Sequence, residues 1–218
     1  LATSPPSGAG PPLRSSRTIV LTSGTTGAPK GAKRPRPRGF VGLVSILSRI
    51  PLKPRETVLL SAPMFHTWGY AALQLGLALR STMVLQRTFD PTAARTALIE
   101  HECTAMFASP VMLQRMLEAD AAAGVTGTHR GGRKLRIVAV SGSALPAGLA
   151  PRFMAAYGSV LYNLYGSTEA SWVAIADPAD LHQDPATAGR PPNGTKIAIV
   201  DEFDRPVAPG EVGRIFVA

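Results

Sequence analysis

The sequence predicts an α/β fold in which a parallel sheet with flanking helices is followed by a small antiparallel β element. Short apolar runs rich in β-branched residues alternate with helix-like stretches through most of the 218 residues, which is typical of parallel strands joined by helices. A composition of 45% hydrophobic and 17% charged residues is sufficient for a large core. From Thr187 onward, Gly and Pro punctuate two short alternating runs, and this pattern indicates antiparallel strands.

Six apolar runs are the candidate strands of the α/β unit, and helix-like stretches lie between them. The strands are predicted at Thr18–Leu21, Thr57–Ala62, Thr82–Leu85, Thr104–Ala108, Ile137–Ser141 and Val160–Leu164. The helices are predicted near Phe40–Ile50, Gly69–Leu79, Pro91–His101, Val111–Ala122 and Ala147–Tyr157. Asp90 is a suitable N-cap for the third helix, and Pro91 suits its first position. The antiparallel strands are predicted at Lys196–Val200 and Arg214–Val217.

The chain divides into three predicted parts: a Pro/Gly/Ser-rich linker at residues 1–17, the α/β unit at 18–186 and the start of a β unit at 187–218. Because the chain opens on Leu1 and stops on Ala218 within an apparent strand, we expect it to be a piece of a larger protein. No run approaches about 18 apolar residues, so no transmembrane helix is expected. The first residues also lack the apolar core of a secretory leader.

Charge and cysteine content disfavour several functions. The net charge is +9, but the basic runs Lys30–Arg38 and His129–Arg136 contain no Phe, Tyr or Trp for base stacking, so nucleic acid is not an expected partner. A basic flank that attracts small polyanions fits as well. Cys103 is the only cysteine, which excludes an internal disulfide and favours a cytoplasmic location. Its setting, "HECTAMFAS", indicates a buried apolar residue rather than a nucleophile.

The stretch "TIVLTSGTTGAPKG" (Thr18–Gly31) puts a hydroxyl- and glycine-rich loop after an apolar run. Main-chain N–H groups, hydroxyls and one ammonium suit a phosphate chain, although many such loops are only flexible surface loops. The Walker pattern is absent, because that pattern requires Gly, four residues and then Gly-Lys-Ser/Thr. The residues with the predicted phosphate role are Thr22, Ser23, Gly24, Thr25, Thr26, Gly27 and Lys30.

Three further motifs follow predicted strands. "LYNLYGSTEAS" (Leu161–Ser171) ends in hydroxyls and a carboxylate that could hold hydrated Mg²⁺, although Glu169 could equally begin a helix. "VAVSGSALP" (Val138–Pro146) either lets a backbone approach a ligand closely or forms a tight turn into a helix. "SAPMFHTWGY" (Ser61–Tyr70) clusters His66 with aromatic residues, either as a pocket wall or for structure alone. Ligands of such folds bind beyond the carboxyl ends of the strands. The loops expected there follow Leu21, Ala62, Val140 and Leu164.

Taken together, "TSGTTGAPKG", "PMFHTWGY", "SGSAL", "YGSTEAS" and "GRPPNGTKIAIVD", in this order, closely resemble the adenylate-forming superfamily, and most of all a bacterial fatty-acid–CoA ligase. The resemblance covers roughly Thr18 to Ala218. It implies that a carboxylate attacks the α-phosphate of MgATP to give acyl-adenylate and pyrophosphate, after which the thiol of coenzyme A displaces AMP. The implied partners are therefore a fatty acid, ATP, Mg²⁺ and coenzyme A.

The resemblance also implies residue roles. The glycine-rich loop and Lys30 would hold the β- and γ-phosphates, Thr168 would reach the α-phosphate, and Glu169 would bind Mg²⁺. His66 would border the acyl tunnel, and Thr168, Glu169 and His66 are the predicted catalytic residues. Tyr165 would flank adenine. The other residues of the predicted nucleotide and acyl site are Ser141, Gly142, Ser143, Ala144, Asn163, Gly166 and Ser167.

The substrate can be narrowed by the same resemblance. Amino-acid-activating members place an Asp in the slot that His66 fills here, and no carboxylate occurs between Phe65 and Gly76. An α-amino acid would bury its ammonium unpaired, so a plain acyl or aryl carboxylate fits better. A fatty acid is the expected substrate. An aryl or other carboxylate, or a carrier protein in place of coenzyme A, is the alternative.

Parts of the family pattern are missing. The ribose-binding Asp of a "TGD" segment is expected beyond Ala218, and the N-terminal region and the mobile C-terminal domain with its catalytic Lys lie outside the chain. We therefore expect the 218 residues alone to bind nucleotide weakly or not at all and to turn nothing over. Alternatives of other classes are a hydrolytic NTPase and a non-catalytic module that binds polyanions or nucleic acid. Peripheral membrane association stays open, and neither acyl chain length nor oligomeric state is predicted.

Overall fold

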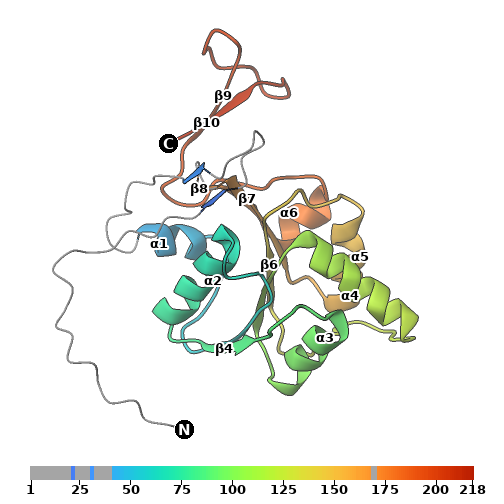
Figure 1. Ribbon diagram of the computed structural model, residues 1–218. Coiled ribbons are helices and arrows are strands. Elements are labelled where there is room, and N and C mark those ends of the chain that lie inside the picture. The colour runs from blue at the N-terminus through green and yellow to red at the C-terminus, as the bar shows by residue number, and fades with distance from the viewer. Residues whose placement is uncertain (1–20, 23–29, 32–40, 168–170) are drawn as a thin grey trace, which may run out of the picture.

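A six-stranded sheet forms the centre of the protein (Figure 1). The computed structural model describes residues 21–22, 30–31, 41–167 and 171–218. In spatial order the strands are β4 (Thr82–Leu85), β3 (Thr57–Leu60), β5 (Ala105–Ala108), β6 (Ile137–Val140), β7 (Leu161–Ser167) and β8 (Ser171–Ala176). The first five strands are parallel, and β8 runs antiparallel to β7. The predicted α/β class is therefore confirmed.

Helices cover both faces of this sheet. One face, the α2 face, is covered by α1 (Val41–Leu47) and α2 (Thr67–Ala78). The opposite face, the α4 face, is covered by α3 (Pro91–Glu100), α4 (Pro110–Ala122), α5 (Leu149–Tyr157) and α6 (Pro178–Gln183). Along β6, Val138 and Val140 pack in the α4-face core, whereas Ile137 and Ala139 pack in the α2-face core, so the strand is apolar throughout. None of the helices in the described ranges has the length and apolarity needed to cross a bilayer.

Two helices begin at an Asp-Pro pair. At α3, Asp90 Oδ1 accepts a 2.7 Å hydrogen bond from Ala93 N and Pro91 takes the first helical turn, which confirms the predicted N-cap. At α6, Asp177 and Asp180 form a reciprocal capping box around the same kind of start. Neither α6 nor β8 was among the predicted elements, although α6 has the signature that located α3.

The described end of the first predicted strand lies outside the parallel sheet. Of Thr18–Leu21, only the last residue is described, and it forms β1 (Leu21–Thr22). β1 pairs antiparallel with β2 (Lys30–Gly31) in a separate two-stranded ladder. The prediction that the loop at residues 23–29 follows a strand of the main sheet was therefore wrong. Pairing across a short glycine-containing loop costs less loop-closure entropy than pairing with a strand that lies far away in the sequence.

The last part of the chain forms the predicted antiparallel element. β9 (Ile197–Val200) pairs with β10 (Arg214–Val217), and this hairpin extends away from the central sheet (Figure 1). The segment that leads to it runs along the outer edge of β8, where Ile175 and Arg190 exchange main-chain hydrogen bonds of 2.9 and 3.1 Å. The proposed domain boundary at residue 187 stays a prediction.

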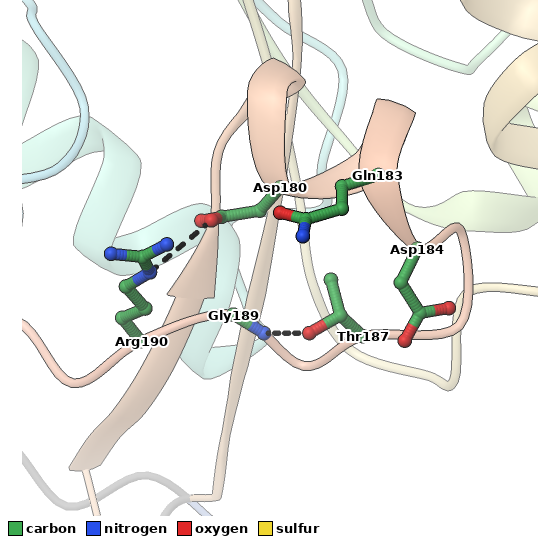
Figure 2. Close-up of a pocket in the computed structure, with 6 residues that line it drawn as sticks. All are labelled: Asp180, Gln183, Asp184, Thr187, Gly189 and Arg190. Atoms are coloured by element: carbon green, nitrogen blue, oxygen red, sulfur yellow. Dashed lines mark hydrogen bonds and ion pairs between the residues drawn. The ribbon is translucent and has the colours of Figure 1, made fainter.

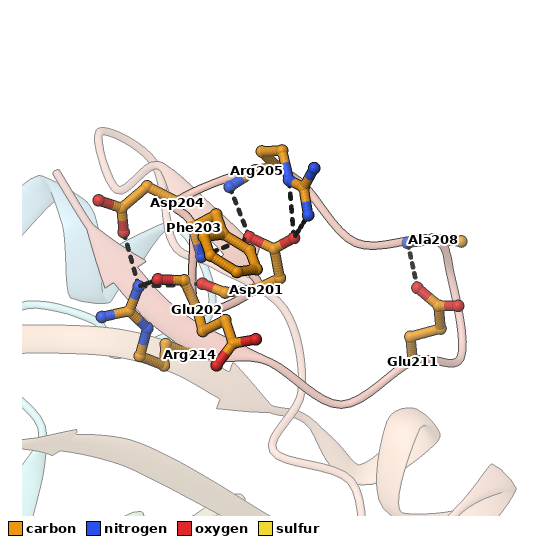
Figure 3. A network of polar contacts seen from close by, with 8 residues as sticks. All are labelled: Asp201, Glu202, Phe203, Asp204, Arg205, Ala208, Glu211 and Arg214. Atoms are coloured by element: carbon orange, nitrogen blue, oxygen red, sulfur yellow. Dashed lines mark hydrogen bonds and ion pairs between the residues drawn. The ribbon is translucent and has the colours of Figure 1, made fainter.

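Carboxylates organise the connection between β9 and β10 (Figure 3). Asp201 Oδ1 accepts main-chain hydrogen bonds from Phe203 at 2.8 Å and from Arg205 at 2.9 Å. The bond from the Arg205 main chain is the largest cause of a lowered pKa at the Asp201 carboxyl. Arg214 donates to Asp204 at 2.7 Å. These bonds hold the long connection in one conformation although it lies outside the core.

A buried carboxylate joins the helices of the α4 face. Asp120 is 2% exposed and pairs with Arg95 Nε at 3.1 Å and with Arg130 Nη1 at 3.5 Å. It also accepts a 2.9 Å hydrogen bond from the Tyr157 hydroxyl. Burial, and then the bond to Asp120, raises the pKa of Tyr157. Since a buried charge is tolerated only when it is paired, this network fixes α3, α4 and α5 relative to one another.

Internal ion pairs neutralise much of the basic run His129–Arg136. The pairs are Arg130–Asp120, Lys134–Glu102 and Arg136–Glu56. Each pairing reduces the charge available to an external polyanion. This agrees with the expectation that nucleic acid is not a partner, which stays a prediction.

Candidate active site

Several predicted site residues lie at one edge of the sheet. β3, β5, β6 and β7 are parallel and paired in register, so their carboxyl ends meet at the same edge. His66 leaves this edge after β3, Ser141–Ala144 leave it after β6, and Asn163–Ser167 form the last part of β7. The structure thus brings three of the sequence motifs together, and their chemical roles stay predictions.

Main-chain hydrogen bonds in the turn from β3 into α2 fix the position of His66. Ala62 N donates to Phe107 O at 2.9 Å, and His66 N donates to Pro63 O at 3.1 Å. His66 is the N-cap residue of α2, and its ring lies 4.5 Å from the ring of Phe65. Phe65 is 79% exposed. The turn therefore presents two adjacent rings to solvent at the carboxyl edge, where a planar or apolar ligand group could contact them.

Trp68 is part of the core rather than of this exposed surface. It is 6% exposed, and its Nε1 donates to Ala108 O at 2.9 Å. Its ring lies 5.3 Å from Phe107 and 6.2 Å from Trp172. Sequence reasoning missed Trp172 because β8 was not predicted. The apolar run "SWVAIA", ended by Asp-Pro, was the signal that could have located this strand.

The turn after β6 is largely exposed. Gly142 has φ +97°, a conformation that favours glycine, and apart from its chain neighbours no atom of the described residues lies within 4 Å of the position that a Cβ would take. Ser141 is 8% exposed, whereas Ser143 and Ala144 are exposed. Helix α5 begins only at Leu149, so this segment is not a tight strand-to-helix turn. Its main-chain groups are therefore accessible at the edge of the sheet.

The end of β7 lies beside this turn. Asn163 is the partner of Val140 across the β6–β7 ladder, and Tyr165 is 46% exposed. A bulge between Tyr165 and Gly166 interrupts the register with β8. The next described element is the strand β8, and the alternative that Glu169 begins a helix falls on a residue outside the described ranges. Two predicted catalytic residues of this motif, Thr168 and Glu169, lie outside the described residues.

Only the backbone of Thr22 and Lys30 is described in the glycine-rich loop. These two residues are cross-strand partners in the β1–β2 ladder. Antiparallel partners stand about 4.5–5.5 Å apart, so the ladder holds the two ends of the loop together. The other residues predicted to bind phosphate lie outside the described residues. They are Ser23, Gly24, Thr25, Thr26 and Gly27.

Neither a metal cluster nor a reactive thiol is found where the structure describes the chain. No three His, Cys, Asp or Glu side chains gather there in a way that could hold a metal ion. Cys103 is fully buried, with its Sγ 3.6 Å from Ala97 O, and burial raises the pKa of its thiol to about 11. Cys103 is therefore a neutral core residue at pH 7, as its sequence context indicated.

An open hollow of about 460 Å³ lies elsewhere, beside α6 (Figure 2). Two contacts join residues that line it: Arg190 Nε lies 3.3 Å from Asp180 Oδ1, and Gly189 N donates to Thr187 Oγ1 at 3.1 Å. Asp184 accepts a hydrogen bond from Ala186 N. The hollow shares no residue with the predicted site, and its contacts stabilise the segment between α6 and β9.

Open, mostly parallel α/β sheets bind their ligands outside the carboxyl ends of their strands, where the turns described above lie. The description "AMP-binding enzyme" belongs to the family whose sequence profile matches residues 4–218. The chain belongs to this family, which confirms the resemblance drawn from its motifs.

Curated relatives and solved structures agree with this assignment. A feruloyl-CoA synthase from Amycolatopsis sp is 31% identical over 92% of this chain, and a 2-succinylbenzoate–CoA ligase from Geobacillus kaustophilus is 30% identical over 92% of it. The chain spans only 40% and 39% of these two relatives. The structure of O-succinylbenzoate coenzyme A synthetase from Bacillus subtilis in complex with AMP has a TM-score of 0.76 and 27% identity, covering 91% of this chain and 40% of that one.

Proposed function

We propose that the protein containing this chain joins a carboxylic acid to coenzyme A in two steps. A carboxylate oxygen bonds to the α-phosphorus of ATP, the bond to the bridging oxygen breaks, and pyrophosphate leaves. The thiol of coenzyme A, losing its proton to solvent, then bonds to the acyl carbon and AMP leaves. The main support is the convergence of His66, Ser141–Ala144 and Asn163–Ser167 at one carboxyl edge, in a chain of the AMP-binding family.

The accessible groups at this edge suit the parts of a nucleotide. Tyr165 offers an exposed ring beside which adenine can lie, and the turn at Gly142 offers main-chain groups without an obstructing side chain. The glycine-rich loop and Lys30 would hold the β- and γ-phosphates, and Thr168 would contact the α-phosphate. Charge neutralisation of the phosphates would be the main contribution of these residues to the rate.

Magnesium fits the donors available. Mg²⁺ keeps phosphate oxygens and water in its shell and needs few protein carboxylates. Glu169 would supply one. When bound, the ion would neutralise charge on the phosphates. Glu169 would hold it at the end of β7.

A carboxylate without an α-ammonium group is the proposed substrate. The first turns of α2 provide no carboxylate between residues 65 and 76 to pair with an ammonium. A fatty acid was expected from the sequence, and it remains one candidate. An aromatic acid is the second candidate, because Phe65 and His66 present adjacent rings at the carboxyl edge and two relatives carry the names of aromatic-acid ligases.

Exchange of labelled pyrophosphate into ATP, measured on the full-length parent, tests this proposal. The panel contains fatty acids of several lengths, cinnamic and benzoic acids, and α-amino acids. We expect exchange that requires a fatty or aromatic acid and that falls about 10²- to 10³-fold in Glu169→Gln. Glu211→Gln, which changes a carboxylate in the β9–β10 connection, is the matched control and should keep the wild-type rate. Exchange with amino acids alone, or with no acid in the panel, would contradict the proposal.

A further inference from the structure

The two helices on the α2 face contain no charged side chain. Neither α1 nor α2 includes an Asp, Glu, Lys, Arg or His, whereas each of the four helices on the α4 face includes at least one. A helix that faces water on one side normally carries charged and polar residues there, and a helix that is apolar all round is normally buried. The two layers of helices therefore suit different surroundings.

The outward side of α2 is mostly apolar in the structure. Leu77 is 67% exposed, and Leu73, one turn earlier, is only partly buried although it packs against the α2-face core. Gln74 is the one exposed residue of α2 with a polar side chain, and the whole of α2 lies in the described part of the chain. We call Leu73, Gln74 and Leu77 the outer surface of α2. On α1, Val44 is likewise 56% exposed.

Exposed apolar residues on the α4 face have a different setting. Val111 of α4 is 59% exposed, close to the value for Leu77. On the same helix Arg115 is exposed one turn further on, and Gln114 donates a 2.9 Å hydrogen bond to the exposed Glu118. Single apolar residues among charged neighbours are normal on a protein surface and need no explanation. Because α2 itself supplies no charged neighbours, its outer surface is unusual for a helix that faces water.

The edge of the sheet beside α2 lacks protection as well. In the described sheet β4 is an end strand that pairs with β3, and its four residues include neither a charge nor a proline. Leu85, the last residue of β4, is 52% exposed. A Cβ at Gly76 of α2 would collide with the side chain of Met83 on β4, so the helix and this edge lie side by side. Natural edge strands are often protected by charges, by prolines or by a covering segment, and β4 has neither of the first two, which favours the third.

The parent protein can supply such a segment. This chain spans less than half of the two curated relatives described above, so most of a protein of their length lies outside the 218 residues. Long chains divide into domains that pack against one another through interfaces of about 600–1,500 Å². We propose that the outer surface of α2 and the edge at β4 form an interface inside the parent, covered by a segment from outside these 218 residues. The inference does not depend on which acid the parent activates.

Cysteine labelling of the full-length parent tests whether the surface is covered. Leu77→Cys and Val111→Cys replace residues of similar exposure, so the structure of this chain by itself predicts similar rates of reaction with a maleimide. We expect Leu77→Cys to react at least about tenfold more slowly, because the covering segment must first open. Each rate is corrected for labelling of the wild-type parent, in which Cys103 is buried, and is measured below the unfolding temperature of the variant. Equal rates would overturn the inference.

Photo-cross-linking in the parent identifies the covering segment. p-Benzoylphenylalanine takes the place of Leu77 in one variant and of Val111 in the control, and mass spectrometry identifies the peptides that are joined on irradiation. We expect residue 77 to cross-link, within one molecule, to peptides from outside the 218 residues, with a clearly higher yield than residue 111. Cross-links to a second molecule, or only to residues of the 218-residue chain itself, would overturn the inference. Neither experiment requires activity, so this inference and the proposed function can fail independently.

Discussion

Gly69 lies so close to Pro63 that no side chain fits between them. A Cβ at residue 69 would lie 2.6 Å from the main-chain oxygen of Ala62 and nearer still to that of Pro63. The first turn of α2 therefore rests directly on the chain that leaves β3. This contact sets where α2 begins, and thereby where His66, its N-cap residue, stands at the carboxyl edge.

Gly69→Ala tests this contact. Because the neighbouring atoms are backbone, the helix must shift, and we expect a loss of about 1–3 kcal/mol in the free energy of unfolding. Gly42→Ala in α1 is the matched control, since no atom in the described part of the chain lies within 4 Å of its Cβ position. The control should be neutral or stabilising by up to about 1 kcal/mol. Urea unfolding of both variants measures the difference, and equal stability of the two would show that the contact is not tight.

The hydrogen bond between Trp68 and Ala108 gives a second prediction. Trp68→Phe keeps an aromatic ring but removes the buried N–H donor, which should lower the free energy of unfolding by about 1–3 kcal/mol. Trp172→Phe is the control, because no described residue bonds its indole N–H, and its loss should stay below about 1 kcal/mol. Denaturant titration of the two variants ranks them, and a larger loss in the control would reverse the assignment.

The third prediction concerns the buried carboxylate of Asp120. Asp120→Asn leaves Arg95 and Arg130 without their charged partner, so we expect a loss of about 3–5 kcal/mol in the free energy of unfolding. Glu118→Gln makes the same chemical change on an exposed position of α4 and should stay within about 0.5 kcal/mol of wild type. Thermal and urea unfolding provide the measurement. Similar losses at both positions would mean that the network does not stabilise the fold.

The thiol of Cys103 gives a prediction about pH. Its pKa is raised to about 11 by burial, so the folded state holds the proton more tightly than the unfolded state. Its contribution to stability is complete below an unfolded thiol pKa of about 8.5 and is lost as the pH rises toward 11. The stability advantage of wild type over Cys103→Ala should therefore be smaller at pH 10 than at pH 8, as measured by urea unfolding. An advantage that does not change with pH would contradict this.

The sequence predicted most of the fold because its signals are local. The apolar runs at Thr57–Ala62 and Ile137–Ser141 contain β3 and β6, and Asp90 marks the start of α3. The pairing of Leu21 with Gly31 could not be predicted in this way. Whether a short strand joins the main sheet or pairs with the strand across the next loop depends on tertiary contacts. β8 was not predicted, because its apolar run "SWVAIA" begins at Ser171, the last residue of the motif "LYNLYGSTEAS".

The sequence predicted which motifs form the candidate site, but it did not predict how these motifs are arranged in space. The residues at positions 66, 141–144 and 163–167 were found from composition and from the resemblance, and the parallel register of β3, β5, β6 and β7 brings them to one edge. The contact of Trp68 with Trp172 could not be predicted, since it joins residues more than one hundred positions apart on elements whose packing the sequence does not specify.

The central claim is that a carboxylate oxygen attacks the α-phosphate of ATP at this edge. The most direct test supplies the full-length parent with a carboxylic acid from the active part of the panel, labelled with ¹⁸O at both oxygens of its carboxyl group, together with ATP, Mg²⁺ and coenzyme A. Mass spectrometry of the released AMP then shows the origin of its new oxygen. We predict one ¹⁸O atom in each AMP. AMP that takes its new oxygen from the solvent instead would contradict the account.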